Sequence, residues 1–415
     1  MNLLLKSSTC IPQSIIAITG SKSETNRLLL LQALYPNLIL ENTSNSDDSE
    51  VMMKALQSNE TLIDIHHAGT AMRFLTAYFA IQENREVVLT GSSRMKERPI
   101  KILVDALRQL GAEISYEENE GFPPIRIKGK KITQNKVSLS ANVSSQYISA
   151  LLLIAPKLEN GLELTLEGKI TSVPYIKMTL SLLNELGIET SFIDNKITVK
   201  PLVTLSAVEG PNPLSLIVES DWSSASYYYS IIALSAIGTE ITLSSYKKNS
   251  LQGDSVLAEI YKNFGVETTF QNNTVLLKKT HNSKLITQNL QLNNSPDIAQ
   301  TIAVTCFGLG IGCHLTGLQT LKIKETDRLL ALKTELEKLG ANVLITNDSL
   351  TLEPSVIARH ELIPISTYQD HRMAMAFAPL ALKTNIIIKD AEVVSKSYPA
   401  FWEDLKSIGF QLENH

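Results

Sequence analysis

Residues 181–200 read SLLNELGIETSFIDNKITVK and contain the pattern that decides the fold. An amphipathic helix ends at Leu186-Gly187, and two short strands follow, separated by the polar turn Asp194-Asn195. A glycine after the last apolar residue is a common left-handed end of a helix. A polar pair between two apolar-rich segments favours a hairpin. The stretch therefore predicts a helix followed by two antiparallel strands.

The same helix ending occurs five times along the chain. The pairs are Leu110-Gly111, Leu186-Gly187, Phe264-Gly265, Leu339-Gly340 and Ile408-Gly409, and their glycines lie 69 to 78 residues apart. In four of the five, a polar turn and a second strand follow the first strand. Repeats of this length are far longer than solenoid periods, so each is interpreted as a small α/β unit. Their number implies two domains of several repeats. Residues 209–213, Glu-Gly-Pro-Asn-Pro, are the best interior candidate for a crossing between domains, although they fit an ordinary loop equally well.

Helix starts carry the second recurring feature. Gly20-Ser21-Lys22-Ser23-Glu24-Thr25-Asn26-Arg27 places the cations Lys22 and Arg27 and the hydroxyls of Ser21 and Ser23 where a helix begins. Ser21 and Glu24 have the spacing of a capping box, and Ser23 and Arg27 share one face. Free N–H groups of a first turn favour negative charge. The segment is therefore suited to an anion, and a capped helix with a solvated basic turn is the alternative.

Other expected helix starts carry similar groups, and Lys324-Glu325-Thr326-Asp327-Arg328 is the densest. Helical spacing there predicts Lys324 and Arg328 on one face, flanking the Glu325 carboxylate. A cation about 4 Å from an anion contributes on the order of 4 kcal/mol at an effective dielectric near 20, against about 0.3 to 1 for a helix terminus. The cations should dominate, and the ligands should be small phosphates and carboxylates. The remaining starts are His67 to Arg73, Ser144 to Gln146, Ser172 with Pro174, Ser295 to Asp297, Asp370 to Arg372, and Lys396 ahead of Phe401.

Composition restricts the class of protein. The chain has 415 residues, of which 44% are apolar and 19% charged, so it can bury a large core. Its formal charge of −4 argues against a nucleic-acid binder, and the basic residues matter by their placement. Cys10, Cys306 and Cys313 lack metal-ligand spacing and indicate reduced thiols in a cytoplasm. We expect no signal peptide and no segment long enough to span a bilayer.

Taken in order, the motifs resemble those of the 5-enolpyruvylshikimate-3-phosphate synthase family, which belongs to the enolpyruvyl transferases. The resemblance runs nearly end to end. It is carried by Gly20 to Arg27, Ala68-Gly69-Thr70-Ala71-Met72-Arg73, Arg94-Met95-Lys96-Glu97-Arg98-Pro99, Ser144-Ser145-Gln146, Lys324 to Arg328, and Asp370-His371-Arg372-Met373-Ala374-Met375.

The resemblance implies a two-domain inside-out α/β barrel. Each domain would consist of three βαβαββ repeats around buried parallel helices. The first domain would span residues 18–217, and the second would combine residues 1–17 with 218–415. In the family, the active cleft lies between the two domains.

The implied reaction transfers the enolpyruvyl group of phosphoenolpyruvate to the 5-hydroxyl of shikimate 3-phosphate and releases phosphate, on the route to chorismate and the aromatic amino acids. The family needs no metal and no organic cofactor. The expected partners are these two small substrates, with no nucleic acid and no membrane. We expect a cytoplasmic monomer.

The site residues implied by the resemblance fall into three groups. Asp297 would take the 5-hydroxyl proton, and Glu325 would exchange a proton at the substrate methylene with assistance from Lys22. The shikimate 3-phosphate ligands would be Lys22, Ser23, Arg27, Ser144, Ser145, Gln146, Ser172, Asp297 and Lys324. The phosphoenolpyruvate ligands would be Lys22, Gly69, Arg98, Gln146, Arg328, Arg372 and Lys396. A carboxylate between Lys324 and Arg328 stays ionised without other influences, so an acid role for Glu325 requires the pocket to raise its pKa.

Two of the departures from the family pattern concern the phosphoenolpyruvate site, and two alternative functions remain. His66-His67 stands where the family usually has Gly-Asn, and Phe74 replaces a proline; both changes are expected beside the phosphoenolpyruvate phosphate. UDP-N-acetylglucosamine enolpyruvyl transferase shares the fold but uses a cysteine in the loop that here contains Ser92 to Arg94. The other alternative is an inactive small-anion-binding relative, against which the retained Lys22, Asp297, Glu325 and Lys396 argue.

Overall fold

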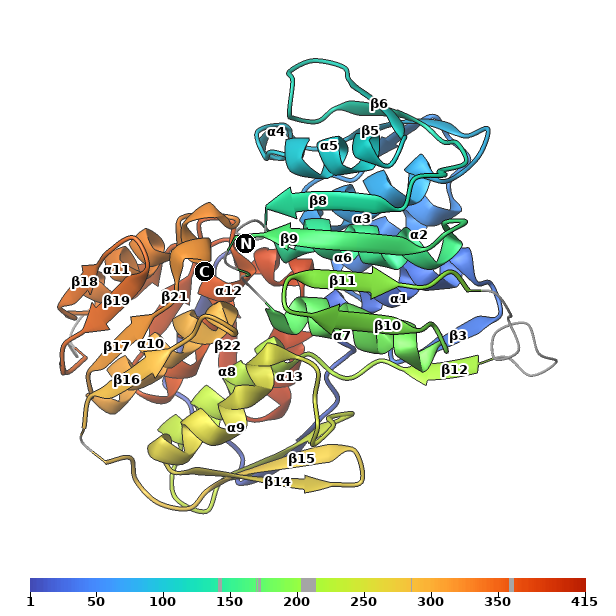
Figure 1. Ribbon diagram of the computed structural model, residues 1–415. Helices are drawn as coiled ribbons and strands as arrows, with labels where there is room; N and C mark the ends of the chain where they lie inside the picture. The colour runs from blue at the N-terminus through green and yellow to red at the C-terminus, as the bar shows by residue number, and fades with distance from the viewer. Residues whose placement is uncertain (141–143, 169, 171–172, 203–213, 285, 358–361) are drawn as a thin grey trace. The chain divides into compact units, whose positions relative to one another are not determined.

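The computed structural model describes residues 1–415 except 141–143, 169, 171–172, 203–213, 285 and 358–361 (Figure 1). The contacts between backbone positions divide the chain into two compact units. Residues Gly20–Val218 form one, here called the inserted unit. Residues Met1–Thr19 and Glu219–His415 form the other, here called the composite unit. The candidate crossing at residues 209–213 lies outside the described residues.

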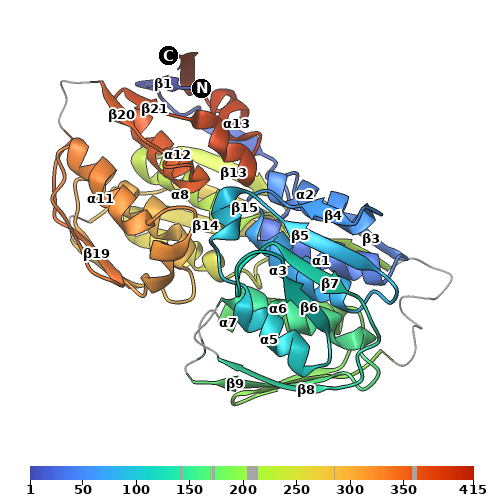
Figure 2. The same ribbon diagram turned by 90° about the horizontal axis from the view of Figure 1, so that it is seen from above.

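The inserted unit alternates strands and helices. Its elements are α1 (Lys22–Leu34), β3 (Leu38–Glu41), α2 (Asp47–Gln57), β4 (Leu62–Asp64), α3 (Gly69–Ala80), β5 (Glu86–Thr90), α4 (Ser93–Lys96), α5 (Lys101–Gln109), β6 (Glu113–Tyr116), β7 (Ile125–Lys128), β8 (Lys136–Ser140), α6 (Ser145–Ile154), the 3₁₀ helix η1 (Ala155–Lys157), β9 (Leu162–Glu167), α7 (Val173–Glu185), β10 (Thr190–Ile193), β11 (Lys196–Val199) and β12 (Leu214–Ile217). In both views the sheet containing β8 and β9 covers α6 (Figures 1 and 2).

Two sheets of the inserted unit share one topology. Their orders are β4-β5-β7-β6 and β8-β9-β11-β10, with the first two strands parallel and the hairpin antiparallel. This is the predicted βαβαββ repeat. The third sheet differs, because only the parallel pair β12 and β3 is present among the described residues. Since α2 ends at Gln57 and β4 begins at Leu62, the chain has no room for a hairpin there.

The composite unit contains three four-stranded sheets among its described residues. Its elements are β1 (Leu3–Lys6), β2 (Gln13–Ile16), α8 (Trp222–Leu234), β13 (Glu240–Ser244), η2 (Gly253–Val256), α9 (Leu257–Ile260), η3 (Tyr261–Phe264), β14 (Val266–Gln271), β15 (Thr274–Lys279), β16 (Gln288–Gln291), η4 (Pro296–Ile298), α10 (Ala299–Leu309), β17 (Cys313–Thr316), η5 (Gln319–Ile323), α11 (Arg328–Lys338), β18 (Val343–Ile345), β19 (Ser349–Leu352), β20 (Ile363–Ile365), α12 (His371–Phe377), η6 (Ala378–Leu382), β21 (Ile386–Ile388), η7 (Ala391–Lys396), α13 (Phe401–Ser407) and β22 (Gln411–Asn414).

The N-terminal strands complete two of these sheets. β2 pairs in parallel with β13, and β1 lies between β21 and β22 with antiparallel pairing on both sides. β1 thus fills the place that the last strand of a hairpin occupies in the other repeats. This explains why the fifth helix-glycine-strand segment, which ends at β22, has no second strand after it.

The predicted fold class is confirmed, because buried helices form the core of each unit and sheets surround them. α1, α3 and α6 contact one another in the inserted unit, and α10 contacts α8 and α12 in the composite unit. Nearly every residue of α6 and α8 is buried, as expected for helices that are apolar on all sides. All five predicted helix-ending glycines have a positive φ, between 77° and 103°.

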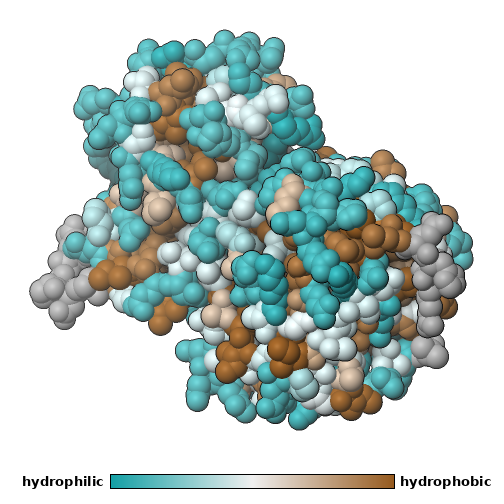
Figure 3. Space-filling model, turned by 180° about the vertical axis from the view of Figure 1, so that it is seen from behind, coloured by the Kyte–Doolittle hydropathy of each residue, from teal (hydrophilic) through white to brown (hydrophobic). Residues whose placement is uncertain are grey.

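Within the described residues, no helix is both long enough and apolar enough to cross a membrane. Several large apolar side chains are nevertheless exposed, including Ile15, Ile193 and Ile323. On the face in Figure 3, apolar residues are interspersed among polar ones. Single exposed apolar side chains are ordinary on protein surfaces.

Candidate active site

In the inserted unit, the starts of α1, α2 and α3 are linked through Asp48. Lys22 Nζ lies 3.3 Å from Asp48 Oδ2, and His67 Nε2 lies 3.9 Å from Asp48 Oδ1. The Asp48 side chain is only 11% exposed, so the Lys22 interaction is partly shielded from water. Lys22 is therefore held in place by a carboxylate that sequence analysis did not identify. The sequence signal for Asp48 is its position among the acidic residues in the first turn of α2.

The predicted capping box at α1 is wrong. Ser21 occupies the N-cap position, but its side chain makes no capping hydrogen bond. The first-turn N–H groups therefore lack that hydroxyl partner, which suits a segment that binds an external anion.

Arg27 is buried deep in the same unit. Its guanidinium donates to the Ser23 carbonyl at 2.6 Å, to Ser149 Oγ at 3.0 Å and to Thr179 Oγ1 at 2.8 Å. Burial lowers the pKa of Arg27 to about 10, which still leaves it charged at neutral pH. These three hydrogen-bond acceptors are neutral, so an anion nearby would stabilise the buried charge. Ser149 was detectable in principle, because it lies one turn after Ser145 on α6.

Phe74 contributes to the environment of Arg27. Its ring centroid lies 5.5 Å from the Arg27 guanidinium carbon, and the Tyr175 ring lies 5.8 Å from it. The family resemblance predicts the Phe74 departure beside the phosphoenolpyruvate phosphate. The structure puts the Phe74 ring against Arg27, which the resemblance assigns to shikimate 3-phosphate.

Gly69 and Arg98 are in close contact at the start of α3. A Cβ atom at Gly69 would lie 2.6 Å from Arg98 Nη1, so only glycine leaves room for the guanidinium in this position. Arg73 lies one turn further along, is 4% exposed, and donates to the Gly69 and Pro99 carbonyls. Burial, together with the charge of Arg98, lowers the pKa of Arg73 to about 10. Two neighbouring guanidinium groups favour an anion here.

Arg94 and Lys96, the other cations of the motif that contains Arg98, pair with carboxylates at the surface. Arg94 pairs with Glu97 at 2.8 Å, and Lys96 pairs with Glu118 at 2.8 Å. Both are surface ion pairs, which agrees with the solvated-turn interpretation for this stretch.

The start of α6 connects to the start of α3. Ser144 is the N-cap, with its Oγ accepting from the Gln146 N–H at 3.3 Å. Gln146 Nε2 donates to Thr70 Oγ1 at 3.0 Å, and Ser145 is 8% exposed. The helix start predicted for Ser172 is present as α7, but Ser172 itself lies outside the described residues.

The composite unit gathers three cations on one carboxylate. Asp297 Oδ1 lies 2.9 Å from Arg328 Nη1 and 3.3 Å from Lys324 Nζ, and Asp297 Oδ2 lies 3.4 Å from Arg372 Nη2. Burial by itself would raise the pKa of Asp297, but Lys324, Arg372 and Arg328 together hold it well below its usual range. Asp297 is therefore ionised at any physiological pH in this arrangement.

The predicted helical spacing of Lys324 and Arg328 is wrong. Helix α11 begins only at Arg328, because Asp327 is its N-cap and accepts from the Leu330 N–H at 3.1 Å. Lys324 belongs to the preceding non-helical segment. The two cations still meet, but the carboxylate between them is Asp297 and not Glu325. Glu325 pairs with Arg328 Nη2 at 2.7 Å.

Arg328 is the centre of this cluster, with a side chain only 2% exposed. Besides Asp297 and Glu325, it donates through Nε to Asp370 Oδ2 at 2.6 Å. Asp370 is also the N-cap of α12, accepting from the Arg372 N–H at 2.8 Å. One carboxylate thus fixes both arginines, a role that sequence analysis missed although it quoted the motif.

Lys396 lies at the end of η7, three residues before Pro399, which with Ala400 leads into α13. Its Nζ donates to the Gln369 carbonyl at 2.8 Å, directly before Asp370 in the chain. The predicted residues Asp297, Lys324, Glu325, Arg328, Arg372 and Lys396 are thus gathered around the starts of α11 and α12 in the composite unit.

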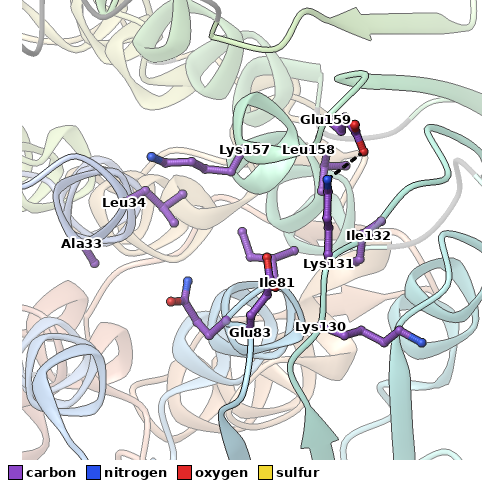
Figure 4. Close-up of a pocket in the computed structure, with 11 residues that line it drawn as sticks. Ala33, Leu34, Ile81, Glu83, Lys130, Lys131, Ile132, Lys157, Leu158 and Glu159 are labelled. Carbon is purple, nitrogen blue, oxygen red and sulfur yellow. Dashed lines mark ion pairs between the residues drawn. The ribbon is translucent and has the colours of Figure 1, made fainter.

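A separate pocket of about 490 Å³ lies elsewhere in the inserted unit (Figure 4). Its lining comes from the C-terminal ends of α1 and α3, from η1, and from the segment before β8, where Lys131 and Glu159 pair at 3.2 Å. None of the predicted site residues lines it. The lining residues are Ala33, Leu34, Ile81, Gln82, Glu83, Lys130, Lys131, Ile132, Lys157, Leu158 and Glu159.

Comparison with known proteins identifies the family. The family model described as EPSP synthase (3-phosphoshikimate 1-carboxyvinyltransferase) matches residues 56–405. A protein named 3-phosphoshikimate 1-carboxyvinyltransferase from Bacteroides fragilis (strain YCH46) is 46% identical, over 97% of this chain and 96% of its own length. A protein of the same name from Haemophilus influenzae is 35% identical, over 95% and 96%.

Solved structures agree on the fold. An EPSP synthase from Acinetobacter baumannii superposes with a TM-score of 0.79 at 19% identity, covering all of both chains. The enolpyruvyl transferase NikO from Streptomyces tendae has a TM-score of 0.72 at 12% identity, covering 99% of this chain and 98% of its own. With the fold, the near full-length relatives and the family model in agreement, the chain belongs to the EPSP synthase (3-phosphoshikimate 1-carboxyvinyltransferase) family.

Proposed function

We propose that this protein transfers the enolpyruvyl group of phosphoenolpyruvate to the 5-hydroxyl of shikimate 3-phosphate and releases inorganic phosphate. The observation that carries the proposal is the set of cations around Asp297 in the composite unit. Lys324, Arg328 and Arg372 lie within 3.4 Å of one carboxylate. Cations gathered around a carboxylate provide both anion binding and a proton acceptor, and this reaction needs both.

The composite-unit residues have distinct roles in this proposal. Arg328, Arg372 and Lys396 bind the carboxylate and phosphate of phosphoenolpyruvate, while Lys324 binds shikimate 3-phosphate. Asp297 takes the proton of the 5-hydroxyl as its oxygen attacks C2 of phosphoenolpyruvate. Glu325 delivers a proton to the methylene carbon C3, giving a tetrahedral adduct. Loss of phosphate from C2 and return of the C3 proton then restore the double bond in the product.

Substrate binding accounts for the strength of the base. In the ligand-free protein the three cations hold the pKa of Asp297 well below its usual range, which makes it a weak base. Anionic substrate groups compete for Lys324, Arg328 and Arg372 and neutralise their charge. The pKa of Asp297 then rises toward a value at which proton transfer is effective.

The inserted-unit residues hold the anionic and hydroxyl groups of both substrates. Arg27, Ser23, Ser144, Ser145 and Ser172 bind shikimate 3-phosphate. Gly69 and Arg98 bind phosphoenolpyruvate at the start of α3, where free N–H groups favour its phosphate. Lys22 and Gln146 contact both substrates, and Lys22 also assists proton transfer at C3.

The test is phosphate release from phosphoenolpyruvate with a choice of acceptor. Shikimate 3-phosphate should support release, whereas UDP-N-acetylglucosamine and buffer alone should not. Release only with UDP-N-acetylglucosamine would assign the protein to the other transferase activity. Tight binding of both substrates without release would identify an inactive anion-binding relative.

We further propose that the protein works as a monomer in the cytoplasm without a metal or organic cofactor. Cys10, Cys306 and Cys313 are all free thiols, which is consistent with a reducing compartment. Among the described residues, no group of three His, Cys, Asp or Glu side chains is arranged to hold a metal ion. Light scattering after size exclusion tests the monomer, and an assay with chelator tests the metal.

A further inference from the structure

Asp254 is a buried carboxylate that the proposed mechanism does not use. It belongs to η2 and is 6% exposed. Its Oδ2 accepts a hydrogen bond from Ser223 Oγ, at the start of α8. Ser223 Oγ in turn accepts from Arg372 Nη2 at 3.2 Å. Asp254, Ser223 and Arg372 thus form a hydrogen-bonded chain of side chains from three different elements, η2, α8 and α12.

The Ser223 hydroxyl donates a hydrogen bond on one side and accepts one on the other. A serine hydroxyl has one proton to donate and two lone pairs that accept. Because the Ser223 proton is directed to Asp254, its lone pairs are available to the Arg372 guanidinium. Without Asp254, the Ser223 proton could rotate toward Arg372, and a donor would then face a donor.

Arg372 has a competing partner. Its Nη2 also lies 3.4 Å from Asp297 Oδ2, and its Nη1 donates to the Asp297 carbonyl at 3.4 Å. Both contacts are longer than the Ser223 bond. If the Ser223 acceptor were lost, the guanidinium would shift toward Asp297, and an anionic ligand would have to displace it from that carboxylate.

The surroundings of Asp254 disfavour the ionised form of its side chain. Burial and the charge of Asp297 raise its pKa to about 7, while Arg372 and the Ser223 hydrogen bond act in the opposite direction and Asp221 adds to the increase. A buried carboxylate that is only partly compensated destabilises a fold. A gain in the positioning of Arg372 would explain its presence.

We propose that Asp254 is a positioning residue, which acts through Ser223 to orient Arg372 for the carboxylate or phosphate of phosphoenolpyruvate. The inference rests on the proposed function for the identity of the ligand. Asp254 does not contact substrate in this role. Its loss therefore weakens phosphoenolpyruvate binding selectively and leaves shikimate 3-phosphate binding unchanged.

The test compares Asp254→Ala, Asp254→Asn and Ser223→Ala in the full-length protein. Asp254→Ala and Ser223→Ala should each raise the KM for phosphoenolpyruvate about tenfold, equivalent to about 1.4 kcal/mol. The KM for shikimate 3-phosphate should change less than about twofold. Asp254→Asn should recover most of the affinity, because its amide oxygen accepts the Ser223 proton. The double variant with both alanines should be no worse than Ser223→Ala alone, since both changes break the same hydrogen-bonded chain.

A matched control is Glu335→Gln. Glu335 is fully buried in the same unit and holds the Ser366 N–H and the Tyr368 hydroxyl. This change should lower the thermal midpoint without altering either KM. An unchanged phosphoenolpyruvate KM in Asp254→Ala, an equal rise in both KM values, or additive effects in the double variant would each overturn the inference.

Calorimetric titration of phosphoenolpyruvate without an acceptor, which prevents turnover, separates this inference from the proposed function when it is combined with the phosphate-release assay. If the wild type turns over but Asp254→Ala binds phosphoenolpyruvate as tightly, the inference fails and the function stands. If the wild type binds phosphoenolpyruvate without turnover and Asp254→Ala loses that binding, the function fails and the positioning role stands. If the wild type neither binds nor turns over, both are wrong.

Discussion

Lys22 illustrates how a single residue can matter to chemistry and little to the fold. Its Nζ lies 3.3 Å from Asp48 Oδ2, and its side chain is 20% exposed. We predict that Lys22→Ala abolishes phosphate release, with a loss of at least about 100-fold, as expected for a group that assists proton transfer. Circular dichroism and the thermal midpoint should stay close to those of the wild type. Near-normal turnover would remove Lys22 from the mechanism.

A substitution at Gly69 tests the importance of its close contact with Arg98 at the start of α3. A methyl group there would lie 2.6 Å from Arg98 Nη1 and would displace the guanidinium. We predict that Gly69→Ala raises the KM for phosphoenolpyruvate at least about tenfold with little change in stability, because the long Arg98 side chain can move aside. Steady-state kinetics with each substrate varied measures the effect.

Gly111 is the matched control for Gly69. It has a φ of 103°, and a Cβ there would meet no atom within 4 Å. Gly111→Ala should therefore destabilise the helix end by about 1 kcal/mol through backbone strain and leave both KM values unchanged. If the two alanine variants behave alike, the contact with Arg98 is not what makes Gly69 important.

Asp254 has a second measurable consequence, in the pH dependence of stability. Its pKa is raised from near 3.8 to about 7 in the folded protein. A raised pKa means that the folded state holds the Asp254 proton more tightly than the unfolded state does. The stabilisation of the fold by this proton is therefore fully present below about pH 4 and is lost as the pH rises through about 7. We predict that Asp254→Asn is more stable than the wild type at pH 8.

The difference in unfolding free energy between Asp254→Asn and the wild type is about 1.4 kcal/mol for each unit of pKa shift, which gives a few kcal/mol. It should grow between about pH 4 and pH 7 and stay constant above. Urea unfolding of both proteins at pH 4, 6 and 8 measures it. A difference that is the same at all three values would mean that the charge of Asp254 is compensated in the folded state.

Among the elements, α11 depends on its capping residue. Asp327 accepts from the Leu330 N–H at 3.1 Å, and the next residue is Arg328, which contacts three carboxylates. We predict that Asp327→Ala lowers the unfolding free energy by about 1 kcal/mol, the usual effect of losing an N-cap. Asp327→Ser should restore most of it. An equal loss in both variants would mean that the charge matters and the cap does not.

Helix boundaries also show the limit of local patterns. The spacing of Lys324 and Arg328 fits one helical face and predicts a helix over residues 324–328. Asp327 is a strong N-cap residue and ends that possibility, since a cap has non-helical backbone angles. The helix ends were more reliable, because each of the five glycines has the positive φ that its position requires.

At the scale of the whole molecule, the first strand joins the N-terminus to the C-terminal sequence. β1 lies between β21 and β22, with Leu5 fully buried. We predict that deleting residues 1–6 strongly destabilises the composite unit, because both neighbouring strands lose their ladder and Leu5 leaves the core. Amide hydrogen exchange should show the lost protection in β21 and β22 first, with α3 and α6 affected least.

The control for this deletion is Lys6→Ala. Lys6 is on the same strand and pairs with Glu413 at the surface. Because an exposed ion pair contributes little, this variant should retain the exchange pattern of the wild type. Uniform loss of protection in both units after the deletion would show that the chain unfolds as a single cooperative body.

The sequence by itself determined the repeat, its α/β composition and the positions of most helix starts of this protein. These depend on local properties: glycine at a left-handed helix end, apolar periodicity, and basic or hydroxyl side chains in a first turn. Only the tertiary structure decided which groups meet. Asp297, Lys324, Arg328 and Arg372 are far apart in the chain, as are Asp254 and Ser223, and β1 and β22. Such pairs form because packed helices and sheets bring them together, and no local propensity encodes that packing.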